Sequence, residues 1–194
     1  MSKIYYYAGC MNSIKTGQLI CTAYNYREKG MTPIILTSAK DKRSGINKVK
    51  SRIEGLEYKA ISIKDSDNLF EVIGNVSETL EYKIDVVLVD EVQFFTPAQI
   101  DQLTDIVDFI DIPVLCYGIK TDFRQKGFPA SIRLLEVADE IIKLKSMCSC
   151  GRAAGVNARI ENGKIVTEGN QIQIGGNESY TAMCRRCWKL SLSK

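Results

Sequence analysis

Near its start the chain carries a segment that matches most of a nucleotide phosphate-binding loop. Such loops follow the pattern G-x-x-x-x-G-K-[ST], and residues 9–16 of this chain read G-C-M-N-S-I-K-T. In this pattern, backbone N–H groups at the start of a helix bind phosphate oxygens. The lysine (Lys15) reaches the terminal phosphates and the hydroxyl (Thr16) holds Mg²⁺. Ile14 stands where the pattern has its second glycine.

The isoleucine leaves two interpretations of this loop open. Glycine at this place permits close approach of a phosphate or an unusual backbone dihedral, and a β-branched residue forced to positive φ costs about 1–3 kcal/mol. The segment is therefore either a nucleotide site with one altered residue or a chance match to the pattern. The loop alone does not decide between them.

A pair of carboxylates after an apolar strand favours the nucleotide site. Residues 85–90 read DVVLVD, a continuous apolar run typical of a strand buried in a parallel sheet, and Glu91 follows. A phosphate-loop protein needs an acid at the end of a neighbouring strand to hold Mg²⁺, and Asp90 fits that role. Glu91 is then free to take a proton from a nucleophile, because the chain has no histidine for this task. The alternative is a solvated pair of carboxylates at a strand end.

Four of the seven cysteines form two close pairs, which indicates a metal site. Cys148 and Cys150 are separated by one residue, and Cys184 and Cys187 lie about 35 residues further on. Two such pairs suit a tetrahedral zinc site, and four protein ligands leave no position for water, so we expect structural zinc. Redox cysteines or core thiols are the alternatives.

Composition indicates a soluble globular protein of one sizeable domain, or of one domain plus a small module. The chain has 194 residues, 45% of them hydrophobic and 25% charged, and its net charge of +3 is too small to argue for a nucleic-acid or membrane partner. No apolar run approaches the roughly 20 residues of a membrane-spanning helix, and the start is too short and too polar for a signal peptide. We therefore expect a cytoplasmic protein with three buried free thiols at Cys10, Cys21 and Cys116.

The elements that must position these residues alternate between strands and helices up to about residue 145. Strands are expected over residues 3–8, 33–37, 58–63, 85–90, 112–117 and 140–144, and helices over residues 16–29, 68–80, 97–110 and 131–138. The lysine-rich segment 38–55 is expected to be a mobile loop. The alternation predicts an α/β fold, a phosphate-loop parallel sheet with flanking helices. Because the composition then shifts to Gly, Asn and Cys, we expect a nucleotide-binding domain over residues 1–145 and a zinc-binding domain over residues 146–194.

Eight motifs, found in order along the chain, carry a resemblance to a known family. They read KIYYYAGCMNSIKT, AYNYREKGM, DEVQFF, YGIKTDFR, FPASIRLLEVAD, CSCGRAAGVNARI, IGGNESY and CRRCW. Over nearly its whole length the chain resembles the type II (cytosolic-like) thymidine kinases, in particular their bacterial branch. The resemblance implies transfer of the γ-phosphate of ATP to the 5′-hydroxyl of thymidine, and also of deoxyuridine, in pyrimidine deoxynucleotide salvage. It further implies ATP, Mg²⁺ and structural Zn²⁺, a homotetramer, and feedback inhibition by thymidine triphosphate.

The resemblance assigns roles on the phosphate side by motif. Glu91 corresponds to the general base that takes the 5′-hydroxyl proton, Lys15 is the other catalytic residue, and Asp90 corresponds to the acid on the metal side. The residues implied to bind ATP and metal are Gly9, Cys10, Met11, Asn12, Ser13, Ile14, Lys15, Thr16, Asp90, Glu91, Val92 and Gln93. Two arginines, Arg43 and Arg159, are expected near the phosphates.

On the nucleoside side, residues 172–180 correspond to a lasso that closes over the base. Gly175 and Gly176 would let main-chain groups approach a flat ring closely. Phe94 corresponds to an aromatic residue against the thymine face, although ordinary core packing would also account for it. The residues implied to bind the nucleoside are Met11, Phe94, Ile119, Phe123, Phe128, Ile172, Gly175, Gly176 and Tyr180.

The chain departs from the family pattern at Ile14 and in the segment KDKRSGINKVKSRIEG. Ile14 leads us to expect weaker ATP binding and slower turnover than in a variant with glycine. It also leaves a catalytically weak or inactive nucleotide-binding relative as an alternative function. In the lysine-rich segment, Glu54 is an additional residue before Gly55, and the basic side chains either contact phosphates or form a solvated flap, which we favour. A zinc-ribbon nucleic-acid binder is a third alternative, against which the near-neutral charge counts.

Overall fold

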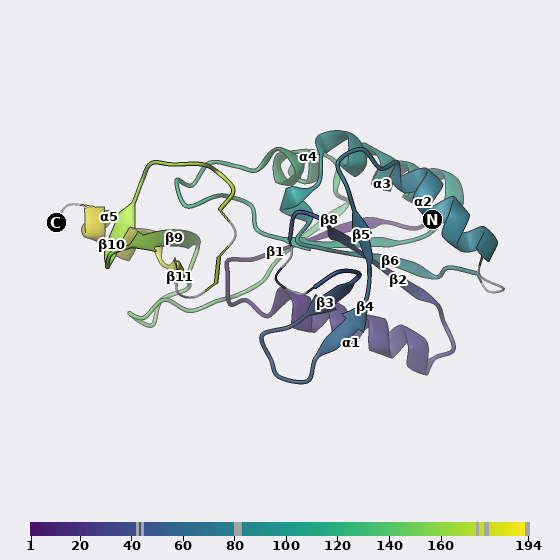
Figure 1. Cartoon of the computed structure of the whole chain (residues 1–194), viewed down its shortest axis with the longest axis horizontal. Coiled ribbons are helices and arrows are strands. Elements are labelled where there is room, and N and C mark those ends of the chain that lie inside the picture. The colour runs from purple at the N-terminus through teal and green to yellow at the C-terminus, as the bar shows by residue number, and fades with distance from the viewer. Residues whose placement is uncertain (42, 44, 80–82, 174, 177–178, 193–194) are drawn as a thin grey trace.

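A parallel sheet forms the centre of the computed structural model, which describes residues 1–41, 43, 45–79, 83–173, 175–176 and 179–192. The sheet has six strands in the order β5-β2-β6-β7-β1-β8, and all its described pairings are parallel (Figure 1). Its strands are β1 (Ile4–Ala8), β2 (Pro33–Ser38), β5 (Ile61–Ile63), β6 (Val86–Asp90), β7 (Val114–Gly118) and β8 (Glu140–Lys143). The predicted α/β fold is confirmed.

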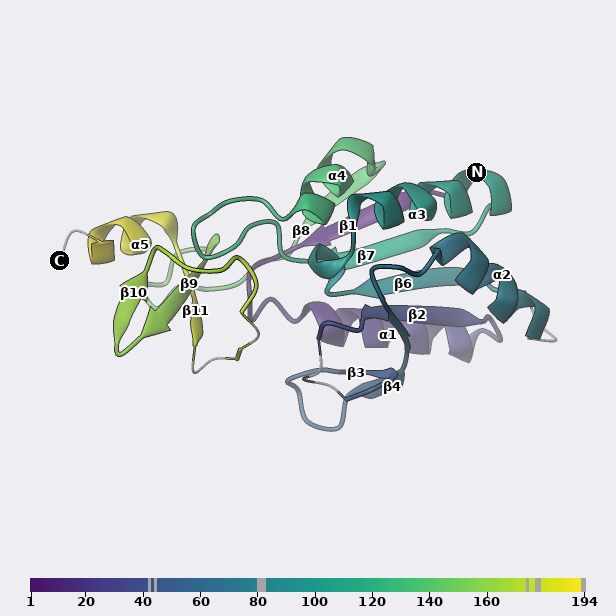
Figure 2. The same cartoon turned by 45° about the horizontal axis from the view of Figure 1, so that its top comes forward.

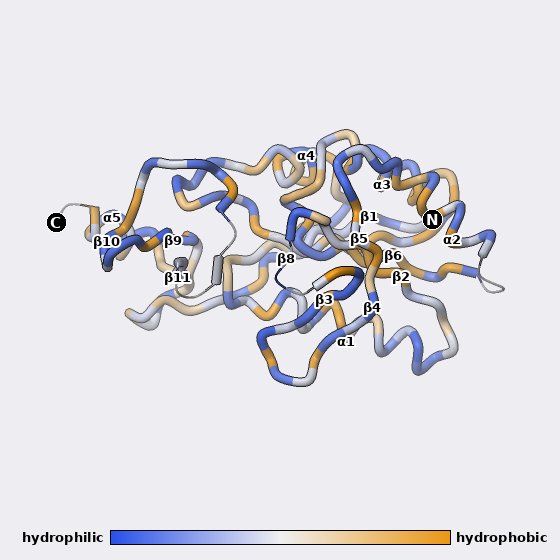
Figure 3. Tube along the Cα trace, in the orientation of Figure 1, coloured by the Kyte–Doolittle hydropathy of each residue, from blue (hydrophilic) through white to orange (hydrophobic). Residues whose placement is uncertain are grey.

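Strand order brings the two candidate phosphate elements to one edge of the sheet. Strands β6 and β7 are buried along their whole length because helices cover both faces, which is why their sequences are almost continuously apolar. Figure 3 shows hydrophobic residues concentrated where these central strands lie. Because β1 and β6 flank β7 in parallel, the loop after β1 and the carboxylates after β6 meet beyond the carboxyl ends of the strands.

The helices form one layer on each side of this sheet (Figures 1 and 2). Helix α1 (Lys15–Glu28) packs on one face, and its Leu19, Ile20 and Ala23 join one apolar cluster. On the other face lie α2 (Leu69–Thr79), α3 (Pro97–Ile110) and α4 (Pro129–Val137), which share the larger cluster. Helix α3 starts with a capping box between Thr96 and Gln99, which satisfies backbone donors that the first turn would otherwise leave free.

A second, smaller sheet lies at the far end of the molecule, beside the C-terminus (Figure 1). It has three antiparallel strands in the order β10-β9-β11 and is followed by a short helix. These elements are β9 (Val156–Glu161), β10 (Lys164–Val166), β11 (Tyr180–Met183) and α5 (Arg185–Leu192). The division into two domains near residue 145 stays a prediction.

Three expectations about local structure are wrong. Of the three thiols expected to be buried, only Cys116 is buried, because Cys21 is exposed and Cys10 is half-buried. The expected loop 38–55 contains β3 (Lys48–Lys50), which pairs with β4 (Glu57–Lys59) to make a hairpin, and the expected strand 58–63 is divided between β4 and β5. The reason is that Val49, which is 1% exposed, packs into the α1 cluster, and Leu56 and Tyr58 on the other side of the hairpin pack against the same cluster. The expected end of the helix at residue 80 lies outside the described residues.

Candidate active site

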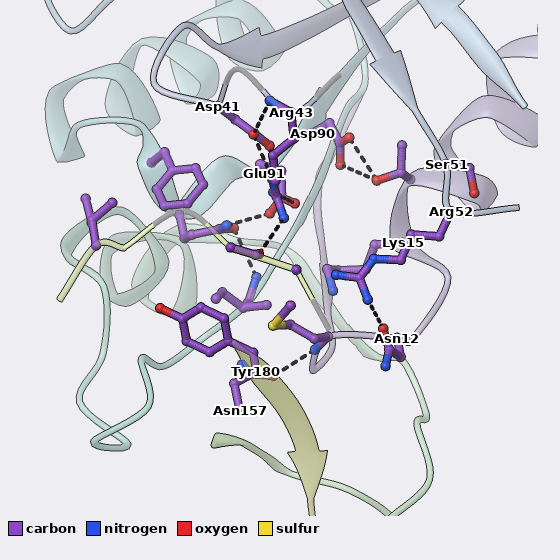
Figure 4. A pocket seen from close by; sticks show the side chains of 18 of the residues that line it. Asn12, Lys15, Asp41, Arg43, Ser51, Arg52, Asp90, Glu91, Asn157 and Tyr180 are labelled. Carbon is purple, nitrogen blue, oxygen red and sulfur yellow. Dashed lines mark hydrogen bonds and ion pairs between the residues drawn. The ribbon is translucent and has the colours of Figure 1, made fainter. Parts of the chain in front are cut away.

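A cavity of about 690 Å³ opens beyond the carboxyl ends of β1, β6 and β7, a size typical of small-molecule sites. Figure 4 shows side chains from separate parts of the chain converging on it. Its described lining comprises Met11, Asn12, Ile14, Lys15, Thr16, Gly17, Asp41, Arg43, Lys50, Ser51, Arg52, Ile53, Asp90, Glu91, Gln93, Phe94, Ile119, Asp122, Phe123, Phe128, Asn157, Gln171, Ile172, Gln173, Gly175, Gly176 and Tyr180. We call residues 171–173 and 175–176 the covering segment.

The predicted phosphate loop has the backbone geometry that its pattern requires. Ile14 adopts φ 59° and ψ 27°, the left-handed conformation that glycine would take without strain. The Ile14 side chain is 56% exposed and lines the cavity. A Cβ on Gly17 would lie only 2.8 Å from Ile14 Cγ2, so the glycine one turn further on makes room for the isoleucine branch. Of the two reasons for a glycine at this place, the unusual backbone dihedral therefore applies to Ile14.

Lys15 is held by the loop itself. Its Nζ donates to the carbonyl oxygen of Cys10 at 2.7 Å and lies 3.4 Å from that of Gly9. Burial lowers the pKa of the Lys15 ammonium, and the charges of Glu91 and Asp90 oppose this shift. The lysine therefore sits close to both carboxylates with its ammonium already partly desolvated, as a phosphate-binding lysine requires.

Thr16 and Asp90 form the expected pair of oxygen donors. Thr16 Oγ1 donates to Asp90 Oδ2 at 3.0 Å, and Asp90 is only 4% exposed. Burial, followed by the charge of Glu91, raises the pKa of Asp90 to about 7. A hydroxyl beside a carboxylate is a donor set that suits Mg²⁺.

Glu91 follows β6 with a left-handed backbone and is held by two neighbouring side chains. Its φ of 48° ends strand β6 and starts the short 3₁₀ turn η1 (Val92–Phe94). Glu91 Oε2 accepts from Gln93 Nε2 at 2.5 Å, and Oε1 accepts from Arg43 Nη2 at 2.7 Å. The amide of Gln93 is itself oriented, because its Oε1 accepts from the backbone N–H of Ile119 at 3.1 Å. Two donors thus hold the Glu91 carboxylate at the cavity wall.

The other end of the cavity is aromatic. The rings of Phe94 and Phe128 meet edge to face, with centroids 6.2 Å apart and planes at 84°. Tyr180 lines the same end, and its hydroxyl donates to the Gln173 carbonyl at 2.8 Å. All nine residues expected to bind the nucleoside line this cavity: Met11, Phe94, Ile119, Phe123, Phe128, Ile172, Gly175, Gly176 and Tyr180.

The four paired cysteines come together, as their spacing predicts. Their sulfur atoms all lie within 4.8 Å of one another, and Cys150 Sγ is 3.7 Å from Cys184 Sγ. A tetrahedral zinc with Zn–S bonds of about 2.3 Å requires sulfur separations of about 3.8 Å. Hydrogen bonds from the backbone N–H groups of Cys150 and Cys184 lower the pKa of the Cys148 thiol to about 6. The cluster is therefore compatible with a structural zinc ion.

Comparison with known proteins places this site in a family. The family model described as thymidine kinase matches residues 2–188. The chain belongs to the thymidine kinase family. Among its relatives, the "Thymidine kinase" of Vibrio vulnificus (strain CMCP6) is 45% identical over 195 residues and covers 100% of both chains.

Two further relatives show the same extent of similarity. The "Thymidine kinase" of Legionella pneumophila subsp. pneumophila (strain Philadelphia 1) is 48% identical over 97% of this chain and 90% of its own. The "Thymidine kinase" of Francisella tularensis subsp. holarctica (strain LVS) is 42% identical over 97% of this chain and 98% of its own. The similarity to these bacterial thymidine kinases therefore extends over nearly all of the chain.

Within this thymidine kinase family member, not every expected site residue faces the cavity. Gly9, Cys10, Ser13 and Val92 are outside its described lining. Ser13 stabilises the loop internally, because its Oγ donates to the Cys10 carbonyl at 2.8 Å. A Cβ on Gly9 would lie 2.2 Å from Ser13 Oγ, so only glycine fits at the start of the loop.

Arg159, which the resemblance places near the phosphates, is buried next to the cavity rather than in its described lining. It is 1% exposed, and its guanidinium lies 3.7 Å from the centroid of the Phe123 ring, outside the described lining. Its Nε donates to the Tyr180 hydroxyl at 3.0 Å and its Nη2 to the Asn170 carbonyl at 2.9 Å. These contacts hold Tyr180 and the residue that precedes the covering segment, and the phosphate role expected of Arg159 stays a prediction.

The structure also adds residues that the sequence interpretation did not assign. Arg52 of the β3–β4 hairpin donates to the Asn12 side chain, which joins the hairpin to the phosphate loop (Figure 4). Asn157 accepts from the backbone N–H of Met11 at 2.7 Å, and buried Asp122 accepts from Gln171 at 3.3 Å. The polar Asn157 lies near the start of strand β9 between Val156 and Ala158, and a polar residue there was the sequence signal for a contact with the loop. Among the described residues, no helix combines the length and the apolar character needed to cross a bilayer.

Proposed function

We propose that the protein transfers the γ-phosphate of ATP to the 5′-hydroxyl of thymidine, with deoxyuridine as a second substrate. The observation that carries this proposal is the convergence of Lys15, Asp90, Glu91 and the Phe94–Phe128 pair on one cavity. A phosphate loop at one end and an aromatic pocket at the other suit a nucleotide donor and a nucleoside acceptor. Membership of the thymidine kinase family supports the same substrate, and the comparisons give no support to an inactive relative.

Glu91 is the general base of this proposal. A 5′-hydroxyl must lose its proton as it attacks phosphorus, and a positioned carboxylate contributes about 10²–10⁴-fold to such a step. The side chain of Glu91 is 19% exposed and lines the cavity between the two ends. A carboxylate accepts hydrogen bonds at about four lone-pair positions, so the contacts with Arg43 and Gln93 leave room for the substrate hydroxyl.

The phosphate end is built to offset negative charge. Lys15 would contact the terminal phosphates, and Thr16 with Asp90 would hold Mg²⁺. When bound, the metal supplies positive charge to the phosphate oxygens. Asp90 must give up its proton to take part, because its pKa is raised to about 7.

We infer further properties from the family resemblance and from the composition. These are a structural zinc ion on the four cysteines, a homotetramer, feedback inhibition by thymidine triphosphate and a cytoplasmic location. The sulfur separations support the zinc ion. The homotetramer and the feedback inhibition rest on the resemblance alone, and the cytoplasmic location is inferred from the composition of the chain.

The test is phosphorylation of labelled thymidine with ATP and Mg²⁺, comparing wild type with Glu91→Gln. Glu91→Gln keeps the size of the side chain but removes the base, so we expect kcat to fall at least about 100-fold. Glu78→Gln is the matched control, because Glu78 is exposed on α2 and outside the cavity lining. Absence of thymidine phosphorylation by wild type, or an unchanged kcat in Glu91→Gln, contradicts the proposal.

A further inference from the structure

We propose that Arg43 is a positioning residue that couples the covering segment to the Glu91 carboxylate, so that nucleoside binding aligns the base. This inference rests on the proposed function and adds a role for Arg43 other than the binding of phosphate. Arg43 contacts its neighbour Asp41 and two parts of the chain that are distant in sequence, Glu91 after β6 and Gly175 of the covering segment.

Asp41 holds the guanidinium in a fixed orientation. Arg43 Nε and Nη2 donate to Asp41 Oδ1 and Oδ2 at 2.8 and 2.6 Å, a two-point contact that sets the plane of the group. Asp41 is itself restrained, because its side chain is 7% exposed and its backbone N–H donates to Ser38 at the end of β2. The orientation of Arg43 is therefore set by the central sheet.

The two remaining contacts of Arg43 join the base to the covering segment. Nη2 donates to Glu91 Oε1 at 2.7 Å, and Nη1 lies 3.5 Å from the Gly175 carbonyl oxygen. The Gly176 carbonyl accepts from the backbone N–H of Tyr180 at 3.0 Å, so this part of the segment is tied to the start of β11. A nucleoside that binds beneath the segment would thus act on Glu91 through one planar cation.

Gln93 completes the arrangement from the opposite side. Its Nε2 donates to Glu91 Oε2 at 2.5 Å while Ile119 fixes its own orientation, so Glu91 lies between two oriented donors. Without Arg43, the carboxylate keeps a contact on one oxygen only and gains rotational freedom. Base alignment and nucleoside affinity should therefore weaken together.

The experiment measures thymidine affinity by calorimetry without ATP, for wild type, Arg43→Gln and Arg43→Lys. We expect the dissociation constant to rise about tenfold in Arg43→Gln, as is typical for loss of hydrogen bonds to a charged group. Arg43→Lys should not restore affinity, because an ammonium cannot make the planar contacts to three partners. Kinetically, Arg43→Gln should lower kcat in wild type but not in the Glu91→Gln background, since both changes act through one carboxylate.

Arg133→Gln is the matched control. Arg133 also joins two carboxylates, Asp101 at 2.6 Å and Glu136 at 2.9 Å, and its side chain is 37% exposed against 34% for Arg43. It lies on α4 outside the cavity lining, so thymidine affinity should not change. Asp41→Asn is a second variant, in which a smaller loss of affinity is expected because Arg43 remains but loses its fixed orientation.

A role in phosphate binding alone gives a different result. In that case Arg43→Gln raises the KM for ATP and leaves thymidine affinity without ATP within twofold of wild type, which overturns the coupling. Failure of the proposed function has a separate signature, because wild type itself would then neither bind nor phosphorylate thymidine, and both proposals would fall.

Discussion

Replacement of Ile14 by glycine should strengthen ATP binding with little change in stability. The left-handed backbone of Ile14 costs about 1–3 kcal/mol, which glycine removes. Full burial of such a side chain provides about 1.5–3 kcal/mol, and because Ile14 is 56% exposed the variant loses about 1 kcal/mol of this. Glycine also adds about 0.4–1 kcal/mol of unfolded-state entropy. These contributions nearly cancel, so we expect a free energy of unfolding within about 1 kcal/mol of wild type.

The gain should appear in ATP kinetics, because the isoleucine branch lines the cavity beside the backbone N–H groups of the loop. We expect Ile14→Gly to lower the KM for ATP about three- to tenfold, equivalent to roughly 1 kcal/mol. The KM for thymidine should change less than twofold, because Phe94, Phe128 and the covering segment form the nucleoside end. Steady-state thymidine phosphorylation with ATP varied at saturating thymidine measures both effects.

Ile53→Ala is the control for loss of apolar bulk. Ile53 is 48% exposed and lines the same cavity, but its backbone is not left-handed. It should leave the KM for ATP unchanged. Equal KM values for ATP in wild type and Ile14→Gly would refute the reasoning and show that the loop tolerates isoleucine.

A double-mutant cycle with Gly17 tests the steric part of this account. Gly17→Ala should destabilise wild type, because its Cβ would meet Ile14 Cγ2 at 2.8 Å. In the Ile14→Gly background the contact with Ile14 is absent and the nearest remaining atom is Ser51 Oγ at 3.3 Å, so alanine should cost less there than in wild type. Additive effects of the two substitutions on urea unfolding would contradict the contact.

Three further predictions concern other parts of the site. The pKa of Asp90 is raised from 3.8 to about 7, so between these values the folded state binds more protons than the unfolded state. In magnesium-free buffer the free energy of unfolding of wild type should therefore fall as pH rises from about 4 to 7. Urea titrations of Asp90→Asn should show a flatter dependence on pH. Parallel pH profiles of the two proteins would contradict the raised pKa of Asp90. Arg159→Met should raise the KM for thymidine about tenfold through loss of its bonds to Tyr180 and Asn170, and an effect on the KM for ATP alone would support a phosphate role. Removal of zinc by a chelator should release one equivalent of metal per chain. It should raise the KM for thymidine more than the KM for ATP, because Tyr180 lies between Cys150 and Cys184 along the chain. A metal content of zero in the purified protein would contradict this prediction.

Local patterns were sufficient to predict much of this protein. The apolar runs and their alternation with helices predicted the parallel sheet, because the pattern of buried and exposed positions can be recognised from residues close together in the sequence. The phosphate-loop pattern singled out Ile14 as a residue where glycine is usual, and the backbone there is left-handed. The paired cysteines predicted a four-sulfur cluster, because two cysteines close together in the sequence commonly supply two ligands of one zinc ion.

Contacts between distant residues were decided by tertiary structure alone. The sequence did not indicate the partners of Arg43 and Arg159, which the resemblance implies to lie near phosphates. The fold puts Arg43 against Glu91 and Gly175, 48 and 132 residues away, and buries Arg159 against Phe123. The β3–β4 hairpin was likewise missed, because it is held by the packing of its apolar residues against the α1 cluster. The type of a residue sets the charge and length of its side chain. The partner of that side chain depends on which loops the folded sheet brings to the same edge.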